Sequence, residues 1–391
     1  MTVRLHHRRA FLHAALALPL APAIAAARPR SQVRSGIVLD AARGAYNVHP
    51  GASIQEALEA AAKDPKNKTV LVHAGTYRPA AKGPALIWFN RRHDGIRLEA
   101  VGDVVLTAAN PDLADRRAPS SPAIVTHVVY FGDGVSARTV FRGFRITGAN
   151  NFTIGQGQRS PIESDDVRKT LYFHSDGGGI KLYARSYPTI ENVEIVDNYA
   201  SPCAGGVSVE HLGQMPEPAT FRNCIFRGNR TQVTGAALDL LHGSWAVVEN
   251  CLFVANLGNM GVDYVGLLAG GEIHPEHGSG ALTVFQGSRA TVRNSTFTGN
   301  WNGVDDIGAG STYENCIFWR NTLAGGIAPG GRYEFDITDA SGVRGTFIHG
   351  EINDRQGTIS RTANTFDPPD PRFDARFVPQ APQYAKVGHR P

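Results

Sequence analysis

The sequence predicts an all-β parallel solenoid, in which short coils of strands stack on one another. Three observations predict it: a nine-residue pattern that recurs five times, an alternation of side-chain character inside each copy, and an uneven spacing between copies. The copies are IENVEIVDN (190–198), FRNCIFRGN (221–229), VENCLFVAN (248–256), VRNSTFTGN (292–300) and YENCIFWRN (313–321).

Each copy has the period of a β-strand. Asn stands at positions three and nine in all five copies, while positions four and six are apolar or small and face inward. Because stacked coils lie ~4.8 Å apart, the sequence predicts an internal ladder of phenylalanines: Phe226, Phe253, Phe297 and Phe318. The two Asn columns are expected at coil corners, where Asn tolerates a left-handed backbone and bonds the amides of the next coil.

The spacing indicates one coil per copy with loops of variable length. Position three recurs at Asn192, Asn223, Asn250, Asn294 and Asn315, so the intervals are 31, 27, 44 and 21 residues. The shortest interval sets the length of a bare coil, and the longer intervals contain loops that leave it.

The segment 48–79 predicts a short helix followed by the first strand. Ser53 and Glu56 fit a capping box, and the strand is expected to begin at Thr69. One apolar stripe lies along the helix: Ile54, Leu58 and Ala61. This helix is expected to cover the open N-terminal end of the solenoid.

This start, together with GGGIKLYARSYPTIENVEIVDN (177–198) and GVSARTVFRGFRITGAN (134–150), resembles the right-handed parallel β-helix proteins of the pectate-lyase-like superfamily. The resemblance covers residues 46–350 and implies a right-handed parallel β-helix with a short N-terminal capping helix. Because this superfamily includes lyases, hydrolases, epimerases and non-catalytic adhesins, the resemblance leaves the activity open. The remaining residues, 351–391, end in a Pro-rich stretch without coil periodicity and are expected to form a C-terminal strap or cap.

Residues 1–27 have the pattern of an export signal. A basic stretch with Arg8 and Arg9 precedes an apolar run and small residues, and the run is shorter than the ~20 residues that a membrane span needs. The paired arginines favour a twin-arginine signal over an ordinary secretory one. The mature protein is therefore expected in the periplasm or outside the cell, without a membrane span.

The composition excludes a strongly basic nucleic-acid binder and a disordered chain. The 391 residues include 39 Lys+Arg and 35 Asp+Glu, for a net charge of +4, and 42% are hydrophobic. Four cysteines are too few for a disulfide framework. Cys224 and Cys251 are expected to be thiols in an inward column, whereas Cys203, in a loop, is the candidate reactive thiol. A monomer is expected.

A second strand precedes each Asn window, in GGIKLYA (178–184), GGVSVEH (205–211), AALDLLH (236–242) and GALTVFQ (280–286). Alternation predicts a polar outer face on these strands. In the shorter segment 304–310 the alignment slips by about one residue, so either of its aspartates could continue an outward column. The candidate catalytic residues on this face are Lys181, Glu210, His211, Asp239, His242, Asp305 and Asp306.

Several chemistries fit these residue types. Asp239 and Asp305 are expected ~9–10 Å apart from the strand spacing, near the upper end for an inverting glycosidase pair. Glu210 with Asp239 could instead hold Ca²⁺, which prefers carboxylate oxygens. Lys181 or a histidine could remove the acidic proton in uronate elimination. A solvated polar face without chemistry is the competing interpretation.

The long insertion at 262–280 is expected to wall a groove beside this face. It contains a His-Pro-Glu-His sequence, a weak signal for a metal site. The insertion at 150–177, which includes Asp176, could form the opposite wall. The candidate substrate-binding residues are Tyr183, Tyr264, His274 and His277.

The leading hypothesis is an exported polysaccharide-active enzyme, a lyase on uronate-containing glycan, with Ca²⁺ as the candidate cofactor. A glycoside hydrolase with paired aspartates is the first alternative. A non-catalytic glycan-binding or structural β-helix protein is the second.

Overall fold

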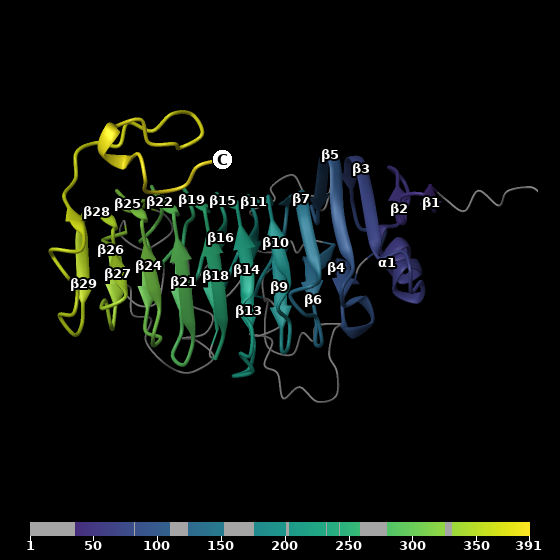
Figure 1. Ribbon diagram of the computed structural model, residues 1–391, viewed down its shortest axis with the longest axis horizontal. Helices are drawn as coiled ribbons and strands as arrows, with labels where there is room; N and C mark the ends of the chain where they lie inside the picture. Colours follow the sequence, from purple (N-terminus) through teal and green to yellow (C-terminus); the bar gives the residue numbers. More distant parts are fainter. Residues whose placement is uncertain are drawn as a thin grey trace, which may run out of the picture. The chain divides into compact units, whose positions relative to one another are not determined.

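A computed structural model describes residues 36–81, 83–109, 124–151, 176–200, 203–231, 233–241, 243–258, 280–324 and 331–391. Residues Ser35–Pro391 form one compact unit. In this unit the strands stack side by side from the N-terminal to the C-terminal coils (Figure 1). Among the described residues, no helix has both the length and the apolarity needed to cross a bilayer.

Sheet A contains the strands of the nine-residue repeats and is the larger sheet. Its strands are β1 (Ile37–Asp40), β2 (Ala45–Val48), β3 (Thr69–Tyr77), β5 (Arg97–Thr107), β7 (Val140–Thr147), β10 (Thr189–Glu191), β11 (Glu194–Val196), β14 (Ala219–Arg222), β15 (Ile225–Arg227), β18 (Trp245–Glu249), β19 (Leu252–Val254), β21 (Arg289–Arg293), β22 (Thr296–Thr298), β24 (Thr312–Glu314), β25 (Ile317–Trp319), β27 (Val343–Arg344), β28 (Phe347–His349) and β30 (Thr365–Phe366). Its pairings are parallel apart from the antiparallel pair of β1 and β2.

Sheet B collects the strands that precede the Asn windows, and all its pairings are parallel. Its strands are β4 (Gly83–Phe89), β6 (Val125–Phe131), β9 (Ile180–Tyr183), β13 (Val207–Glu210), β17 (Leu238–Leu240), β20 (Leu282–Val284), β23 (Val304–Asp306), β26 (Tyr333–Ile337) and β29 (Glu351–Asp354). Three two-residue strands form a small third sheet: β8 (Asn150–Asn151), β12 (Tyr199–Ala200) and β16 (Arg230–Thr231). The protein is therefore a right-handed parallel β-helix, as predicted.

The predicted phenylalanine ladder is present in the core. The ring centroids of Phe226 and Phe253 lie 4.5 Å apart, those of Phe253 and Phe297 4.2 Å, and those of Phe297 and Phe318 4.6 Å, all nearly parallel. All four rings are fully buried. The described cysteines are buried thiols, as expected for the inward column.

Both predicted Asn columns are confirmed, with different roles. The first column has a left-handed backbone, with φ of 53° at Asn223 and Asn250. The second column is buried, and each side-chain amide donates to the next: Asn198 to Asn229 (3.1 Å), Asn229 to Asn256 (3.0 Å), Asn256 to Asn300 (2.9 Å) and Asn300 to Asn321 (2.7 Å). Such a ladder fixes the register of successive coils.

Glu334 ends this buried ladder, and its ionisation is expected to make stability depend on pH. Its carboxylate accepts from the backbone N–H of Asn321 at 3.1 Å and from the Asn321 side chain. Burial raises the pKa of Glu334 to about 7. Because the folded-state pKa exceeds the unfolded value, this group's contribution is fully present below about pH 4.5 and is lost as pH rises through 7.

We therefore expect Glu334→Gln to remove part of the pH dependence of the unfolding free energy. The unfolding free energy of the parent protein minus that of the variant should fall by up to about 3 kcal/mol between pH 4.5 and 8. Urea unfolding across that range measures it. Parallel curves for the two proteins would contradict the assignment, and Glu351→Gln, at an exposed ion pair, is the control.

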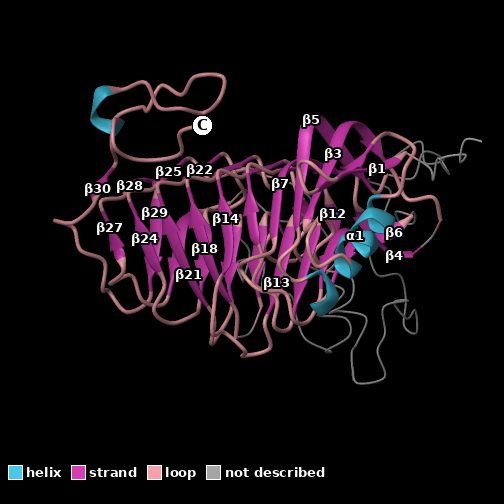
Figure 2. Cartoon of the chain, turned by 45° about the vertical axis from the view of Figure 1, so that its right-hand side comes forward, coloured by secondary structure: helices cyan, strands magenta, loops and turns pink. Residues whose placement is uncertain are grey.

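Helix α1 (Ile54–Lys63) closes the N-terminal end, as predicted (Figure 2). The Ser53 side chain accepts from the Glu56 N–H at 3.2 Å, and Ile54, Leu58 and Ala61 are buried against the first coils. Two short 3-10 helices complete the elements: η1 (Arg91–His93) and η2 (Pro382–Tyr384).

Coils continue past residue 350 through β29 and β30, and the final residues then turn back along sheet A (Figure 1). Tyr384 packs against Ile317 and Trp319 in a small apolar cluster. Further on, the Arg390 N–H donates to the Asn250 side chain at 2.7 Å. The tail is therefore a strap bound to several coils.

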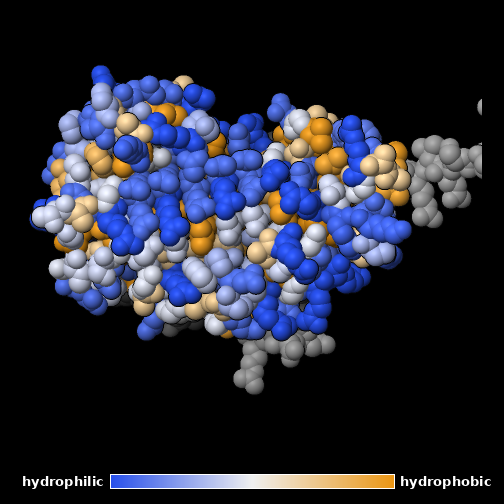
Figure 3. Space-filling model, viewed as in Figure 1, coloured by the Kyte–Doolittle hydropathy of each residue, from blue (hydrophilic) through white to orange (hydrophobic). Residues whose placement is uncertain are grey.

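An alternating column of charges runs along the outer face of sheet A. The register places an acid opposite a base at every step, and ion pairs join all neighbours. The column consists of Glu99, Arg142, Glu191, Arg222, Glu249, Arg293, Glu314 and Arg344. Hydrophilic side chains predominate over the middle coils in the view of Figure 3.

Reversing one charge in this column is expected to destabilise the coil stack. Arg222 lies 3.0 Å from Glu191 and 3.1 Å from Glu249, so Arg222→Glu would place three acids in a row. We expect a loss of about 1 kcal/mol at low salt that shrinks at 0.5 M salt, because the side chain at position 222 is 46% exposed to the screening solvent. Urea unfolding of Arg222→Gln, which removes attraction without adding repulsion, is the matched control. A loss equal in both variants would argue against alternation as the cause.

Candidate functional site

The outer face of sheet B carries a continuous row of polar side chains. The β-register pairs Lys181 with Ser208, Ser208 with Asp239, Asp239 with Thr283, and Thr283 with Asp305. The flanking residues Ile180, Leu182, Val207 and Val209 lie in the core. The expected outward positions of Lys181, Asp239 and Asp305 are thus observed. We call these five side chains, together with the charged side chains next to them, Asp176, Glu210, Asp336 and Arg355, the sheet B row.

Lys181 forms the centre of a buried ionic cluster. Its Nζ lies 2.7 Å from Asp176 Oδ2 and 2.9 Å from Glu210 Oε2, and donates to Ser208 Oγ at 3.1 Å. Ser208 Oγ also donates to Asp176 Oδ2 at 2.5 Å. Lys181 is only 2% exposed, so these partners replace its water.

The charges of this cluster shift the pKa values of its members. Burial alone would lower the pKa of Lys181, but Asp176 and Glu210 outweigh it and raise that pKa above the usual value. Burial raises the pKa of Asp176 to about 6, even though Lys181 opposes the shift. Lys181 is therefore an ammonium ion at neutral pH, and Asp176 exchanges its proton near neutrality.

Asp239 is a fully buried carboxyl with few hydrogen bonds to offset the loss of its hydration. Thr234 Oγ1 donates to its Oδ2 at 3.1 Å, while its Oδ1 has no hydrogen-bond partner. Burial, reinforced by the charge of Asp176, raises the pKa of Asp239 well above its usual value. Asp239 therefore holds its proton to higher pH than an ordinary carboxyl, as a general acid requires.

The two neighbouring aspartates of β23 point in opposite directions. Asp305 faces outward between Thr283 and Asp336, whereas Asp306 pairs in register with the core residues Val284 and Ile337. Asp306 is thus inside the coil, where its Oδ2 accepts from Tyr313 Oη at 2.7 Å. Its expected place on the outer face was wrong, because period two sends adjacent residues to opposite sides.

His211 also lies away from the row, which corrects its expected position. Its ring is buried: Nδ1 accepts from the Trp245 N–H at 3.2 Å, and Nε2 lies 2.9 Å from the Ser186 carbonyl oxygen. Burial lowers the pKa of His211 to about 4. The neutral ring therefore ties together the turns that enter sheet A.

Glu210 and Asp239 do not lie opposite each other in the register of sheet B. Glu210 pairs in register with Tyr183, which is half-buried, whereas Ser208 is the residue opposite Asp239. Cys203, the expected reactive thiol, is fully buried and lies 3.0 Å from Thr234 Oγ1. Within the described ranges, no group of three or more His, Cys, Asp or Glu is arranged to hold a metal ion.

The remaining predicted site residues lie outside the described residues. They are His242, Tyr264, His274 and His277, and the predicted export signal at 1–27 lies there as well. Sequence reasoning placed Asp176 in a loop and overlooked Thr234. Both stand five residues before an outward residue of the row, Asp176 before Lys181 and Thr234 before Asp239, and that spacing was the available signal.

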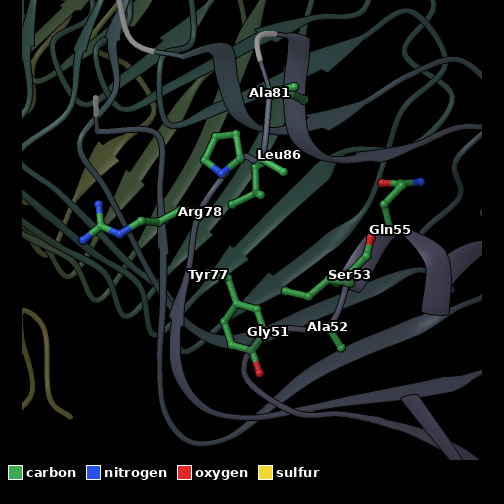
Figure 4. A pocket seen from close by; sticks show the side chains of 12 residues that line it. Gly51, Ala52, Ser53, Gln55, Tyr77, Arg78, Ala81 and Leu86 are labelled. Carbon is green, nitrogen blue, oxygen red and sulfur yellow. The ribbon is translucent and has the colours of Figure 1, made fainter. Parts of the chain in front are cut away.

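A separate cavity of about 300 Å³ lies at the N-terminal end, near helix α1 (Figure 4). Its lining includes Gln55, Tyr77 and Arg78. Gln55 exchanges hydrogen bonds with the Trp88 backbone, and Tyr77 Oη donates to backbone carbonyls. These polar groups are engaged in structural contacts, so we assign no function to this cavity.

The fold and the row together define a parallel β-helix protein with a buried acid–base face. No family model and no curated protein matches the sequence. Among solved structures, the chain is similar to pectate lyase Pel9A, with 14% identity and a TM-score of 0.41 over 82% of this chain and 74% of that one.

Proposed function

We propose that the protein is a polysaccharide-active enzyme whose sheet B row cleaves glycosidic bonds by acid–base catalysis. The observation that carries the proposal is the placement of Asp239 and Asp305 in one outward column, two strands apart across Thr283. Two strand spacings give ~9–10 Å, close to the separation of an acid and a base that act with a water between them.

The roles of the two carboxyls differ in this proposal. Asp239, whose pKa is raised by burial, donates a proton to the glycosidic oxygen as the bond breaks. Asp305 accepts a proton from the attacking water on the other face of the sugar. Rate should fall at high pH as Asp239 ionises.

The lysine chemistry expected for a uronate lyase is less well supported. A base must be neutral to take a proton, and the ion pairs of Lys181 with Asp176 and Glu210 hold it as an ammonium ion. Lys181 instead fits an electrostatic role within the row.

The test is product analysis on a panel of neutral, amino and acidic polysaccharides. New reducing ends without unsaturated sugars support the proposal, whereas absorbance of an unsaturated product identifies a lyase and overturns it. Asp239→Asn is expected to lose about 10²–10⁴-fold in rate while keeping its melting temperature. Glu194→Gln, on sheet A, is the control and should keep full rate. No product from any polysaccharide would also count against the proposal.

A further inference from the structure

The described part of the sheet B row carries more acid than base. Its charged side chains are five carboxyls and two cations, all at most one third exposed apart from the guanidinium of Arg355: Asp176, Glu210, Asp239, Asp305, Asp336, Lys181 and Arg355. Both cations are already engaged, Lys181 with Asp176 and Glu210, and Arg355 with Asp336 at 2.8 Å. Neither cation is left to neutralise an anionic ligand.

Two carboxyl oxygens in the row also lack a hydrogen-bond partner. Oδ1 of Asp176 and Oδ1 of Asp239 are buried without a donor, in side chains that are 1% and 0% exposed. A buried acceptor without a donor is costly, and native structures seldom retain one unless a ligand or water satisfies it. The Asp176 oxygen therefore needs a donor, such as a hydroxyl or an ammonium group, whereas Asp239 is itself the proton donor in the proposed function.

We propose that the substrate is a glycan without carboxylate groups, whose hydroxyl or amino groups donate to Asp176. This inference rests on the proposed function and names its substrate class. A uronate would bring a further negative charge and more acceptors to a face that already has an excess of both. A neutral or amino sugar supplies the donors that the face lacks.

The sharpest test compares glycans that differ only in their carboxyl groups. Polygalacturonate, alginate and hyaluronan oligosaccharides would each be measured by calorimetry against their carboxyl-reduced counterparts. Neutral glucan, mannan and xylan oligomers and a chitosan oligomer complete the panel. EDTA is present throughout, so that no divalent cation bridges a carboxylate to the protein. The inference predicts that at least one carboxylate-free glycan binds, and at least tenfold more tightly than any uronate.

Two variants test whether this selectivity arises at the sheet B row. Asp176→Asn should weaken binding of the preferred carboxylate-free glycan, because it removes a charge and an acceptor. It should also reduce the ratio between the affinity for this glycan and the affinity for its uronate form. Glu194→Gln, on sheet A, should change neither. If Asp176→Asn does not fold, the affinity ratio on the parent protein still decides the matter.

The outcomes separate the two proposals. Cleavage or tight binding of a uronate in EDTA overturns this inference, and hydrolysis with new reducing ends would leave the proposed function standing. Selective binding of carboxylate-free glycans without cleavage supports the inference and removes the proposed function. Failure of every glycan to bind overturns both.

Discussion

Replacing Lys181 by methionine is expected to lower the free energy of unfolding by about 3–5 kcal/mol at neutral pH. The ammonium group is the partner of two buried carboxylates, Asp176 at 2.7 Å and Glu210 at 2.9 Å. Removing it leaves both acids without their counter-charge in a site that is at most 4% exposed. An uncompensated buried charge costs much more than a lost surface ion pair.

The loss should depend on pH in a defined direction. With Lys181 present, the pKa of Asp176 is about 6, and without the lysine it rises further because burial is no longer opposed. In the variant, the protonated form of Asp176 then favours the folded state, so the variant should recover stability as pH falls from 7 to 5. Urea unfolding at both values measures the recovery.

Lys386→Met is the matched control, since Lys386 is exposed in the C-terminal strap. Its effect should stay within about 0.5 kcal/mol. A loss below about 1 kcal/mol for Lys181→Met, or one that is equal at pH 5 and 7, would show that the ionic cluster is not a unit of the fold.

The coil architecture could be predicted from the sequence because stacking repeats one environment in every coil. Phe226, Phe253, Phe297 and Phe318 occupy equivalent positions, so one pattern predicts the whole ladder. The handedness came from the resemblance, because a repeat pattern alone has no hand. The alternating column of sheet A could also have been predicted in part, because five of its eight residues stand directly before position-three asparagines, as Glu191 and Arg222 do.

The candidate site was only partly predictable, since it depends on local departures from the repeat. In β23 two adjacent aspartates compete for one outward position, and a one-residue slip exchanges Asp305 for Asp306. His211 follows the last residue of β13, so the turn rather than the pleat directs its ring. Asp176 reaches Lys181 because the chain bends just before β9, and the five-residue spacing is a signal too short to specify such a bend in advance.

The row also shows why an outward position on this fold does not imply exposure. Ser208, Asp239 and Thr283 point away from the core but are at most 2% exposed. Polar side chains on an outer face are ordinarily solvated, and burial there converts them into groups with shifted pKa values and unmet hydrogen bonds. Outward direction together with burial therefore distinguishes sheet B from the charged face of sheet A, where the arginines keep 39–60% of their side-chain surface.

Truncating Phe253 to alanine is expected to cost about 3–5 kcal/mol, because it opens a cavity in the middle of the ladder. The ring is fully buried and stacks on Phe226 at 4.5 Å and on Phe297 at 4.2 Å. Neighbouring coils are held at strand spacing by backbone hydrogen bonds, so the stack cannot collapse to fill the space. Phe253→Leu, which keeps most of the volume, should cost roughly 1 kcal/mol.

Urea unfolding of both variants tests this reasoning, and the position within the ladder provides a further control. Phe373, in the C-terminal strap, has its aromatic contact with Phe377 at 6.1 Å and lies outside the coil core. Phe373→Ala should therefore cost much less than Phe253→Ala. If the two alanine variants lose equal stability, the strap and the core contribute equally to the unfolding free energy. Stacking through the coils would then not be the main source of cohesion. A large loss confined to Phe253 would show that coil-to-coil packing is the main source of cohesion.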